Sequence, residues 1–225
     1  MRNLNLKAFI GLFVILVVMM AAIFISAWTL NYWQAWVFLL SFFGSSFVIT
    51  LYVMKNDPKL LEKRITAGPL HEKETSQKII QFLAQFAFLL ITIFPSLDHR
   101  FGWSVVSWYI SIVGDILIVV GFYTVFLVFK ENTFASALVE VSAEQKVIST
   151  GPYAYMRHPM YIGALILLFG APLALGSWWG ILTIIPITAV IIWRLLDEER
   201  LLARDLAGYA EYCQKVKYRL IPFVW

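Results

Sequence analysis

The chain contains little charge and almost no cysteine. Only 14% of its 225 residues are charged, whereas 60% are hydrophobic; soluble domains carry about 25% charged residues. Its single cysteine, Cys213, excludes an intramolecular disulfide and a cysteine-rich metal site, and we expect it to be a small buried apolar residue. The composition is therefore atypical of a soluble domain and indicates that lipid is the surrounding solvent.

Two classes of ligand are not expected from the remaining polar residues. The net charge of +4 is modest, and the basic residues follow a membrane topology rather than a nucleic-acid surface. The three histidines, His71, His99 and His158, have no spacing typical of metal ligands. We therefore predict neither a nucleic-acid partner nor a metal site.

Long apolar runs predict an all-α integral membrane protein with about six transmembrane helices. The first run is about 20 residues long, enough to cross a bilayer. It lacks a convincing small-residue cleavage site, so we interpret it as a retained helix. "GSWWG", residues 176–180, predicts that the last two helices form a hairpin with aromatic residues at the membrane interface. The predicted segments are 8–27, 33–54, 79–97, 104–129, 160–175 and 179–196.

Basic residues predict the orientation and organisation of these segments. With six crossings, every one of the 18 Lys and Arg residues except Arg100 falls on one side of the membrane. The positive-inside rule then places both termini in the cytoplasm, in an inner or cell membrane. We divide the chain into residues 1–78, a transmembrane pair with a cytoplasmic loop, and residues 79–225, a core whose binding pocket is formed by 131–225.

The tail after Leu196 shows a helical pattern. Apolar residues recur there at helical spacing with charges on the opposite face, which predicts an amphipathic cytoplasmic helix lying on the membrane or packed over a site. Pro222 is expected to end this helix. The apolar positions are Leu202, Leu206, Tyr209, Cys213 and Val216.

The segment "TGPYAYMRHPMYIG", residues 150–163, is the first candidate site. Pro159 suits the first position of a helix, so Arg157 and His158 lie at a helix N-terminus near the membrane surface. Unsatisfied N–H groups and a positive potential make such a position suitable for carboxylates or phosphates. The ordinary interpretation is that Arg157 is a membrane anchor and His158 a cap.

The segment "WRLLDEER", residues 193–200, is the second candidate site. Arg194 and Glu198 lie four residues apart and share a helical face, with Asp197 and Glu199 beside them. Acidic residues are unusual where a helix leaves the cytoplasmic face, although a charged helix end is the ordinary interpretation.

Two further features are less specific. Residues 131–153 are expected to form an ordered extended loop that can present backbone groups to an adenine ring or a ribose. Asp115 is an acid deep within a predicted crossing, a position that is functional by default. It has no basic partner there, so we expect a hydrogen bond within the bundle and assign no role.

Three quoted segments together resemble a known family. "GPYAYMRHPMYIG", "WRLLDEERLL" and "GYAEYCQKVKYRLIPFVW" are similar to segments of the isoprenylcysteine carboxyl methyltransferases, a family related to the phospholipid N-methyltransferases. The resemblance covers roughly residues 110–225, and the first two crossings together with "NDPKLLEKR" resemble those of prokaryotic-type members. It implies an integral membrane enzyme that takes S-adenosylmethionine at its cytoplasmic side and a lipid-like or lipidated acceptor from the surrounding membrane lipids.

The resemblance also implies roles for individual residues. Arg194 and Glu198 match the family's essential Arg and Glu, with Glu199 as the alternative acid, and Arg157 suits the carboxylate of the methyl donor. The implied catalytic residues are Arg194, Glu198 and Arg157. The implied cofactor-binding residues are Gln145, Lys146, Val147, Ile148, Tyr153, His158, Pro159, Tyr161, Glu198 and Glu199.

Several functions stay open at this point. The acceptor is a carboxylate, which needs no general base, or a phospholipid amine, from which the Asp-Glu-Glu run can take a proton. "EYCQKVKYRLIP" also resembles the end of sterol reductases, which use NADPH but are larger. A membrane scaffold with a degenerate site is the non-enzymatic alternative. A carboxylate-directed methyltransferase is the main prediction.

Overall fold

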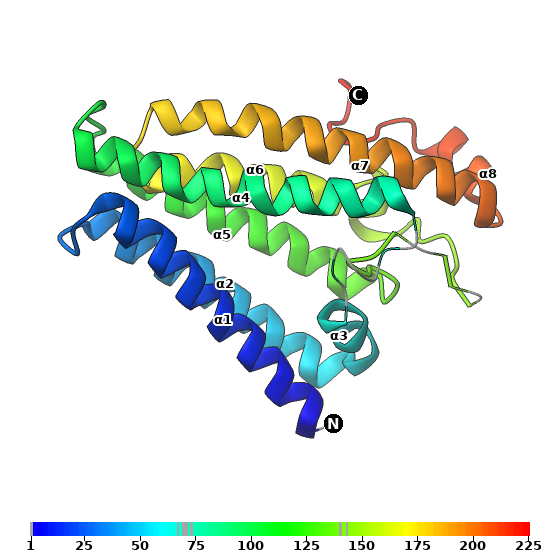
Figure 1. The fold of residues 1–225 in the computed structure, drawn as a ribbon. Helices are drawn as coiled ribbons and strands as arrows, with labels where there is room; N and C mark the ends of the chain where they lie inside the picture. Colours follow the sequence, from blue (N-terminus) through cyan, green and yellow to red (C-terminus); the bar gives the residue numbers. More distant parts are fainter. Residues whose placement is uncertain (1, 67, 69–71, 73, 140, 143) are drawn as a thin grey trace.

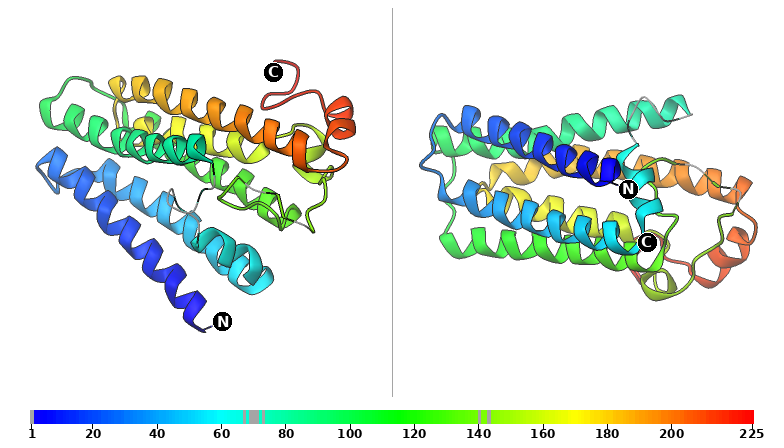
Figure 2. Two further views of the ribbon diagram at one scale, coloured as in Figure 1. Left: turned by 45° about the vertical axis from the view of Figure 1, so that its right-hand side comes forward. Right: turned by 90° about the horizontal axis from the view of Figure 1, so that it is seen from below.

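The computed structural model describes residues 2–66, 68, 72, 74–139, 141–142 and 144–225; His71 lies outside them. The described chain forms a bundle of long helices (Figures 1 and 2). The elements are α1 (Arg2–Ala27), α2 (Trp33–Asn56), α3 (Pro58–Ile65), α4 (Thr75–Phe101), α5 (Trp108–Glu131), the 3-10 turn η2 (Gly151–Ala154), α6 (Pro159–Ala174), the 3-10 turn η3 (Trp179–Thr183), α7 (Ile184–Asp205) and α8 (Tyr209–Lys215).

The described helices confirm an all-α membrane protein. By length and composition, α1, α2, α4, α5 and the segment Trp179–Asp205 can each cross a membrane, and α6 is a shorter apolar helix of 16 residues. Large apolar side chains are exposed along these helices, Leu40 and Ile185 among them, as expected where lipid replaces water. The chain is therefore an integral membrane protein.

The helices are connected alternately at the two ends of the bundle. The turns α1–α2, α4–α5 and α6–α7 lie together at the left end in Figure 1, whereas α3 and α8 lie towards the other end, as do both termini. At the α3 start, Asp57 caps the helix by accepting a hydrogen bond from the Leu60 N–H at 3.0 Å. The end with α3 and α8 is where the polar loops gather.

A buried carboxylate ties the turns at the opposite end together. Asp98, fully buried, accepts hydrogen bonds from the Ser104 N–H at 2.8 Å and from the hydroxyls of Ser104 and Ser177. Tyr32 donates to the Leu175 carbonyl at 2.5 Å. These contacts fix the short α6–α7 connection, which the "GSWWG" segment predicts.

Helices α5 and α6 pack with their backbones almost in contact. A Cβ atom added to Gly121 would lie 2.6 Å from the Gly163 carbonyl oxygen and 2.7 Å from the Leu167 nitrogen, and one added to Gly114 would lie 2.2 Å from the Ala174 nitrogen. Small residues allow such close approach between membrane helices. The α5–α6 pair thus forms a rigid support beneath the polar end.

We expect Gly121→Ala to lower stability by about 1–3 kcal/mol, the usual cost of overpacking. The added methyl group would meet α6 backbone, which cannot move aside as a flexible side chain does. Gly44→Ala is the matched control, because nothing lies within 4 Å of its added Cβ. Thermal unfolding in detergent measures both variants; equal melting temperatures would contradict close α5–α6 packing.

The C-terminal helix differs from its prediction. Helix α7 continues to Asp205, so Leu202 belongs to it, and α8 ends at Lys215 rather than at Pro222. Gly208, at φ +82°, separates the two helices, because this backbone conformation interrupts α-helix. The chain then extends so that Tyr218 and Arg219 hydrogen-bond to the start of α6.

The structure leaves Asp115 without a function. The residue is buried in α5, with 6% of its surface exposed. Neither carboxylate oxygen meets hydrogen-bond geometry in the described residues, although the Ser41 side chain interacts with the carboxylate. No role is assigned to it.

Candidate functional site

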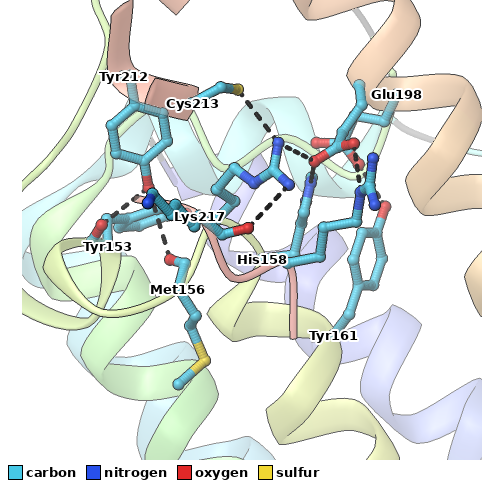
Figure 3. A network of polar contacts seen from close by, with 11 residues as sticks. Tyr153, Met156, His158, Tyr161, Glu198, Tyr212, Cys213 and Lys217 are labelled. Atoms are coloured by element: carbon cyan, nitrogen blue, oxygen red, sulfur yellow. Dashed lines mark hydrogen bonds and ion pairs between the residues drawn. The ribbon is translucent and has the colours of Figure 1, made fainter. Parts of the chain in front are cut away.

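Two segments separated by about 40 residues in sequence meet at the polar end of the bundle. The Tyr161 hydroxyl, in the first turn of α6, donates to Glu198 Oε2 in α7 at 2.5 Å. His158 Nε2 lies 3.3 Å from Glu199 Oε1. Figure 3 shows His158, Tyr161 and Glu198 side by side. The two candidate segments therefore form one site.

Local backbone pairing positions the start of α6. Pro159 occupies the first helical turn and disfavours a helical conformation at His158, whose backbone lies at φ −126° and ψ 61°. The two N–H groups before Pro159 are satisfied by the C-terminal segment: Arg157 donates to the Tyr218 carbonyl at 2.9 Å and His158 to the Arg219 carbonyl at 3.0 Å. This pairing holds the Arg157 and His158 side chains against α7.

Glu199 is the centre of a buried ion cluster. Its Oε1 lies 2.9 Å from Arg157 Nη1, and its Oε2 lies 2.8 Å from Arg219 Nε. Arg157 also contacts Cys213 Sγ at 3.2 Å and the Lys217 carbonyl at 3.3 Å. The Glu199 and Arg157 side chains are only 11% and 10% exposed. Glu199 thus joins α7, the start of α6 and the C-terminal segment.

A cavity of about 460 Å³ lies beside this cluster, within the size range of small-molecule sites, about 300–1,000 Å³. Residues 145–148, Leu206, Tyr209 and Tyr212 form its wall near α8. Arg64, Gln81 and Gln85 form its wall near α3 and α4. Arg194 and Glu198 line it as well, one helical turn apart on α7. The cavity combines apolar walls with a few charged groups, as binding sites do.

Arg194 is held by the loop that follows α5 and by an acid preceding α4. Its Nη2 donates to the Ala137 carbonyl at 2.7 Å and lies 3.5 Å from Glu72 Oε1. Glu72 is 4% exposed and also accepts hydrogen bonds from Gln81 Nε2 at 2.5 Å and the Val139 N–H at 3.3 Å. These contacts fix the guanidinium of Arg194 at the cavity wall.

Three tyrosines, Tyr153, Tyr209 and Tyr212, also line the cavity. Asn132 Nδ2 donates to the Tyr153 hydroxyl at 2.9 Å, and the Tyr212 hydroxyl donates to the Tyr153 carbonyl at 2.8 Å. Burial raises the pKa of Tyr153 to about 12, and burial also raises the pKa of Tyr209 and Tyr212. All three hydroxyls therefore carry their protons at neutral pH.

Most of the candidate residues share this cavity. Pro159 and Glu199 do not line it: Pro159 begins α6, and Glu199 is turned to the ion cluster. Between Glu131, which ends α5, and the 3-10 turn η2 that begins at Gly151, the described residues contain no helix, as predicted. The candidates on the cavity wall are Gln145, Lys146, Val147, Ile148, Tyr153, Arg157, His158, Tyr161, Arg194 and Glu198.

Sequence reasoning missed the wall near α3 and α4. The pocket was predicted from residues 131–225, but Arg64, Gln81 and Gln85 also line it, and Glu72 holds Arg194. Arg64 and Glu72 belong to the charged segment 55–78, which is typical of any cytoplasmic loop. The one sequence signal for this wall is that acidic and basic residues occur together in a segment between two apolar runs.

Comparisons with known proteins find similarity to methyltransferases. The model of the phospholipid methyltransferase family matches residues 109–207. Two proteins described as probable protein-S-isoprenylcysteine O-methyltransferase, from Oryza sativa subsp. indica and subsp. japonica, are each 26% identical over 207 residues. These alignments cover 85% of this chain and 97% of each relative.

A third relative matches a shorter segment. A Delta(14)-sterol reductase from Mus musculus is 29% identical over 90 residues, which is 39% of this chain and 22% of the relative. The long matches are thus to methyltransferases, whereas the reductase match covers a fraction of both proteins. The chain is thus similar to the isoprenylcysteine O-methyltransferases over most of its length and to the phospholipid methyltransferase family over residues 109–207.

Proposed function

We propose that this enzyme transfers the methyl group of S-adenosylmethionine to the free carboxylate of an S-isoprenylated cysteine or a similar lipidated acceptor. The observation that carries the proposal is one cavity lined by Arg194, Glu198 and residues 145–148. The names of the two rice relatives supply the acceptor class. A carboxylate acceptor also suits the positive charge of Arg194 at the cavity wall.

The residues of the cavity fit this methyl donor. Val147, Ile148 and Leu206 offer an apolar wall for an adenine ring, and the protonated Tyr153 and Tyr212 offer polar contacts to a ribose. Glu198 suits an ammonium group or ribose hydroxyls, because its carboxylate faces the cavity. These assignments deepen the sequence prediction and favour Glu198 over Glu199 as the acid of the site.

The chemistry requires alignment more than proton transfer. When bound, the donor supplies an electrophilic methyl group on a sulfonium; an acceptor oxygen forms the new O–C bond while the C–S bond breaks and its electron pair stays on sulfur. Because a carboxylate is already an anion, no residue has to remove a proton. Arg194 then orients the acceptor, and the buried walls exclude water from the reacting atoms.

We place the site at the cytoplasmic side of the membrane, with both termini. The support is the distribution of basic residues: Arg100, beside Trp28 at 5.3 Å, lies at the far end of the bundle, whereas the other Lys and Arg residues of the described chain lie towards the end that holds the cavity. A prokaryotic origin and the absence of a metal stay predictions.

The test is ligand choice in purified protein. S-adenosylmethionine or S-adenosylhomocysteine at 100 times its Kd is expected to stabilise the fold by about 2.7 kcal/mol, raising the melting temperature by about 5–10 °C. NADPH is expected to have no effect. Stabilisation by NADPH alone would instead support a reductase related to the mouse relative.

Methyl transfer to N-acetyl-S-farnesylcysteine identifies the acceptor group. Labelled methyl groups are expected in a product that mild base hydrolyses, because an ester is base-labile. If the label withstands base and appears on a phospholipid amine, the enzyme is a phospholipid N-methyltransferase and the carboxylate acceptor is wrong.

A further inference from the structure

Arg64 occupies the wall of the cavity that the sequence analysis left unassigned. It lies near the end of α3, and its Nη1 donates to the Ala135 carbonyl at 3.0 Å. Its guanidinium carbon lies 4.5 Å from the centre of the Phe129 ring. Arg64 also lines the same cavity as Arg194 and Glu198. Stacking and one hydrogen bond thus orient a cation at the cavity wall.

Arg64 and Arg194 are attached to one short segment of chain. Arg64 binds the Ala135 carbonyl, whereas Arg194 binds the Ala137 carbonyl at 2.7 Å. Each guanidinium carries five N–H donors, so both retain donors after these bonds. Two guanidiniums of fixed position therefore flank one region of the cavity.

The charge of Arg64 is poorly compensated. Arg194 has Glu72 at 3.5 Å, but Arg64 forms no ion pair with a carboxylate in the described part of the chain. Burial and, to a smaller extent, the charge of Arg194 together lower the pKa of Arg64 to about 10. Arg64 is still protonated at neutral pH. An anion in the cavity would relieve this unfavourable burial of positive charge.

The position of Arg64 separates it from the donor-binding groups. Figures 1 and 2 show α3 and α8 on opposite sides of the polar end of the bundle. Tyr209 and Tyr212 of α8 line the cavity with residues 145–148, whereas Arg64 lines it with Gln81 and Gln85 of α4. Arg194 contributes to the same cavity from α7. The α3 side is thus the side left for the acceptor.

We infer that Arg64 and Arg194 together form a binding subsite for the acceptor's carboxylate, and that Arg64 is a specificity-determining residue. The inference rests on the proposed function for the identity of the acceptor. Two fixed guanidiniums favour an anion with two oxygens over a neutral or cationic group. The enzyme accordingly prefers an acceptor acid to its uncharged amide.

The experiment compares an acid with its amide in full-length protein. N-acetyl-S-farnesylcysteine and its carboxamide are titrated into the protein saturated with S-adenosylhomocysteine, using wild type, Arg64→Gln and Lys59→Gln. Gln retains an N–H donor for the Ala135 carbonyl but removes the charge. Lys59 is an exposed cation on the same helix, so Lys59→Gln is the matched control.

We expect wild type and Lys59→Gln to bind the acid at least tenfold more tightly than the amide. Arg64→Gln is expected to lose at least tenfold in affinity for the acid, with little change for the amide and for S-adenosylhomocysteine. In turnover, the acceptor KM rises while kcat changes little.

Four results would overturn the inference. Equal losses for acid and amide would show that Arg64 only supports the loop, and a selective loss of S-adenosylhomocysteine affinity would show that it binds the donor. Unchanged acid affinity would remove Arg64 from the subsite. Tighter binding of a lysophosphatidic acid would make the bound anion a phosphate. If the protein neither binds S-adenosylhomocysteine nor transfers methyl groups, the proposed function fails, whereas the acid and amide titrations, repeated without S-adenosylhomocysteine, still decide whether Arg64 binds an anion.

Discussion

Glu198→Gln is expected to reduce kcat/KM for methyl transfer by about 100-fold or more, equivalent to about 2.7 kcal/mol of transition-state stabilisation. Glu198 lines the cavity and accepts a hydrogen bond from Tyr161. Gln keeps the size of the side chain but loses the negative charge that we assign to the donor's ammonium or ribose. Affinity for S-adenosylmethionine, measured by calorimetry, is expected to fall with activity, while the melting temperature changes little.

Asp197→Asn provides a control with the same change in charge. Asp197 accepts hydrogen bonds from Ser76 at 2.8 Å and Gln77 at 2.6 Å, and it does not line the cavity. Its substitution should leave donor affinity within about twofold of wild type, since no contact to the cavity is lost. Equal losses of activity in Asp197→Asn and Glu198→Gln would show that the effect is general electrostatics, and the assignment of Glu198 would be withdrawn.

Glu199→Ala is expected to destabilise the protein by about 3 kcal/mol or more, because breaking a buried ion pair leaves its partner charge uncompensated, at a typical cost of about 3–5 kcal/mol. The carboxylate contacts Arg157 at 2.9 Å, Arg219 at 2.8 Å and His158 at 3.3 Å. Its loss leaves the buried guanidinium of Arg157 beside the thiol of Cys213. Thermal unfolding in detergent, followed by circular dichroism, measures the change.

Glu211→Ala is the control for a lost acid in the same region, because Glu211 is exposed on α8. Its melting temperature should match wild type. Adjacent acids in α7 are thus predicted to give opposite signatures: Glu198 affects ligand affinity and activity, whereas Glu199 affects stability first. A Glu199→Ala protein of wild-type stability with lost donor binding would exchange the two roles.

The sequence alone could not decide which of Glu198 and Glu199 faces the cavity. The resemblance of "WRLLDEERLL" to a family segment placed the site on this turn but left Glu198 and Glu199 as alternatives. Consecutive residues on an α-helix point about 100° apart, so one faces the cavity and the other faces Arg157 and Arg219. Which acid faces which partner depends on the rotation of α7 about its axis. Packing against α4 and the start of α6 decides that rotation.

The C-terminal tail after Leu196 is a second region where the sequence predicted only part of the structure. Its apolar residues were expected to lie on the membrane or to pack over a site, and Leu206, Tyr209, Tyr212 and Val216 form a buried cluster. Its length as one helix was wrong. Gly208 interrupts the helix through its positive φ, and the chain after Val216 pairs with Arg157 and His158. No local pattern encodes this long-range pairing.

By itself, the sequence determined that this chain is a helical membrane protein with a polar site at one end, because apolar runs of bilayer length and the position of nearly every Lys and Arg are local, additive properties. Only the tertiary structure brought Arg64 and Glu72 to the cavity, since their contacts with Ala135 and Arg194 join segments about 70 and 120 residues apart. Such contacts form where helices converge, and their energies depend on burial, charge and distance that exist only in the assembled bundle.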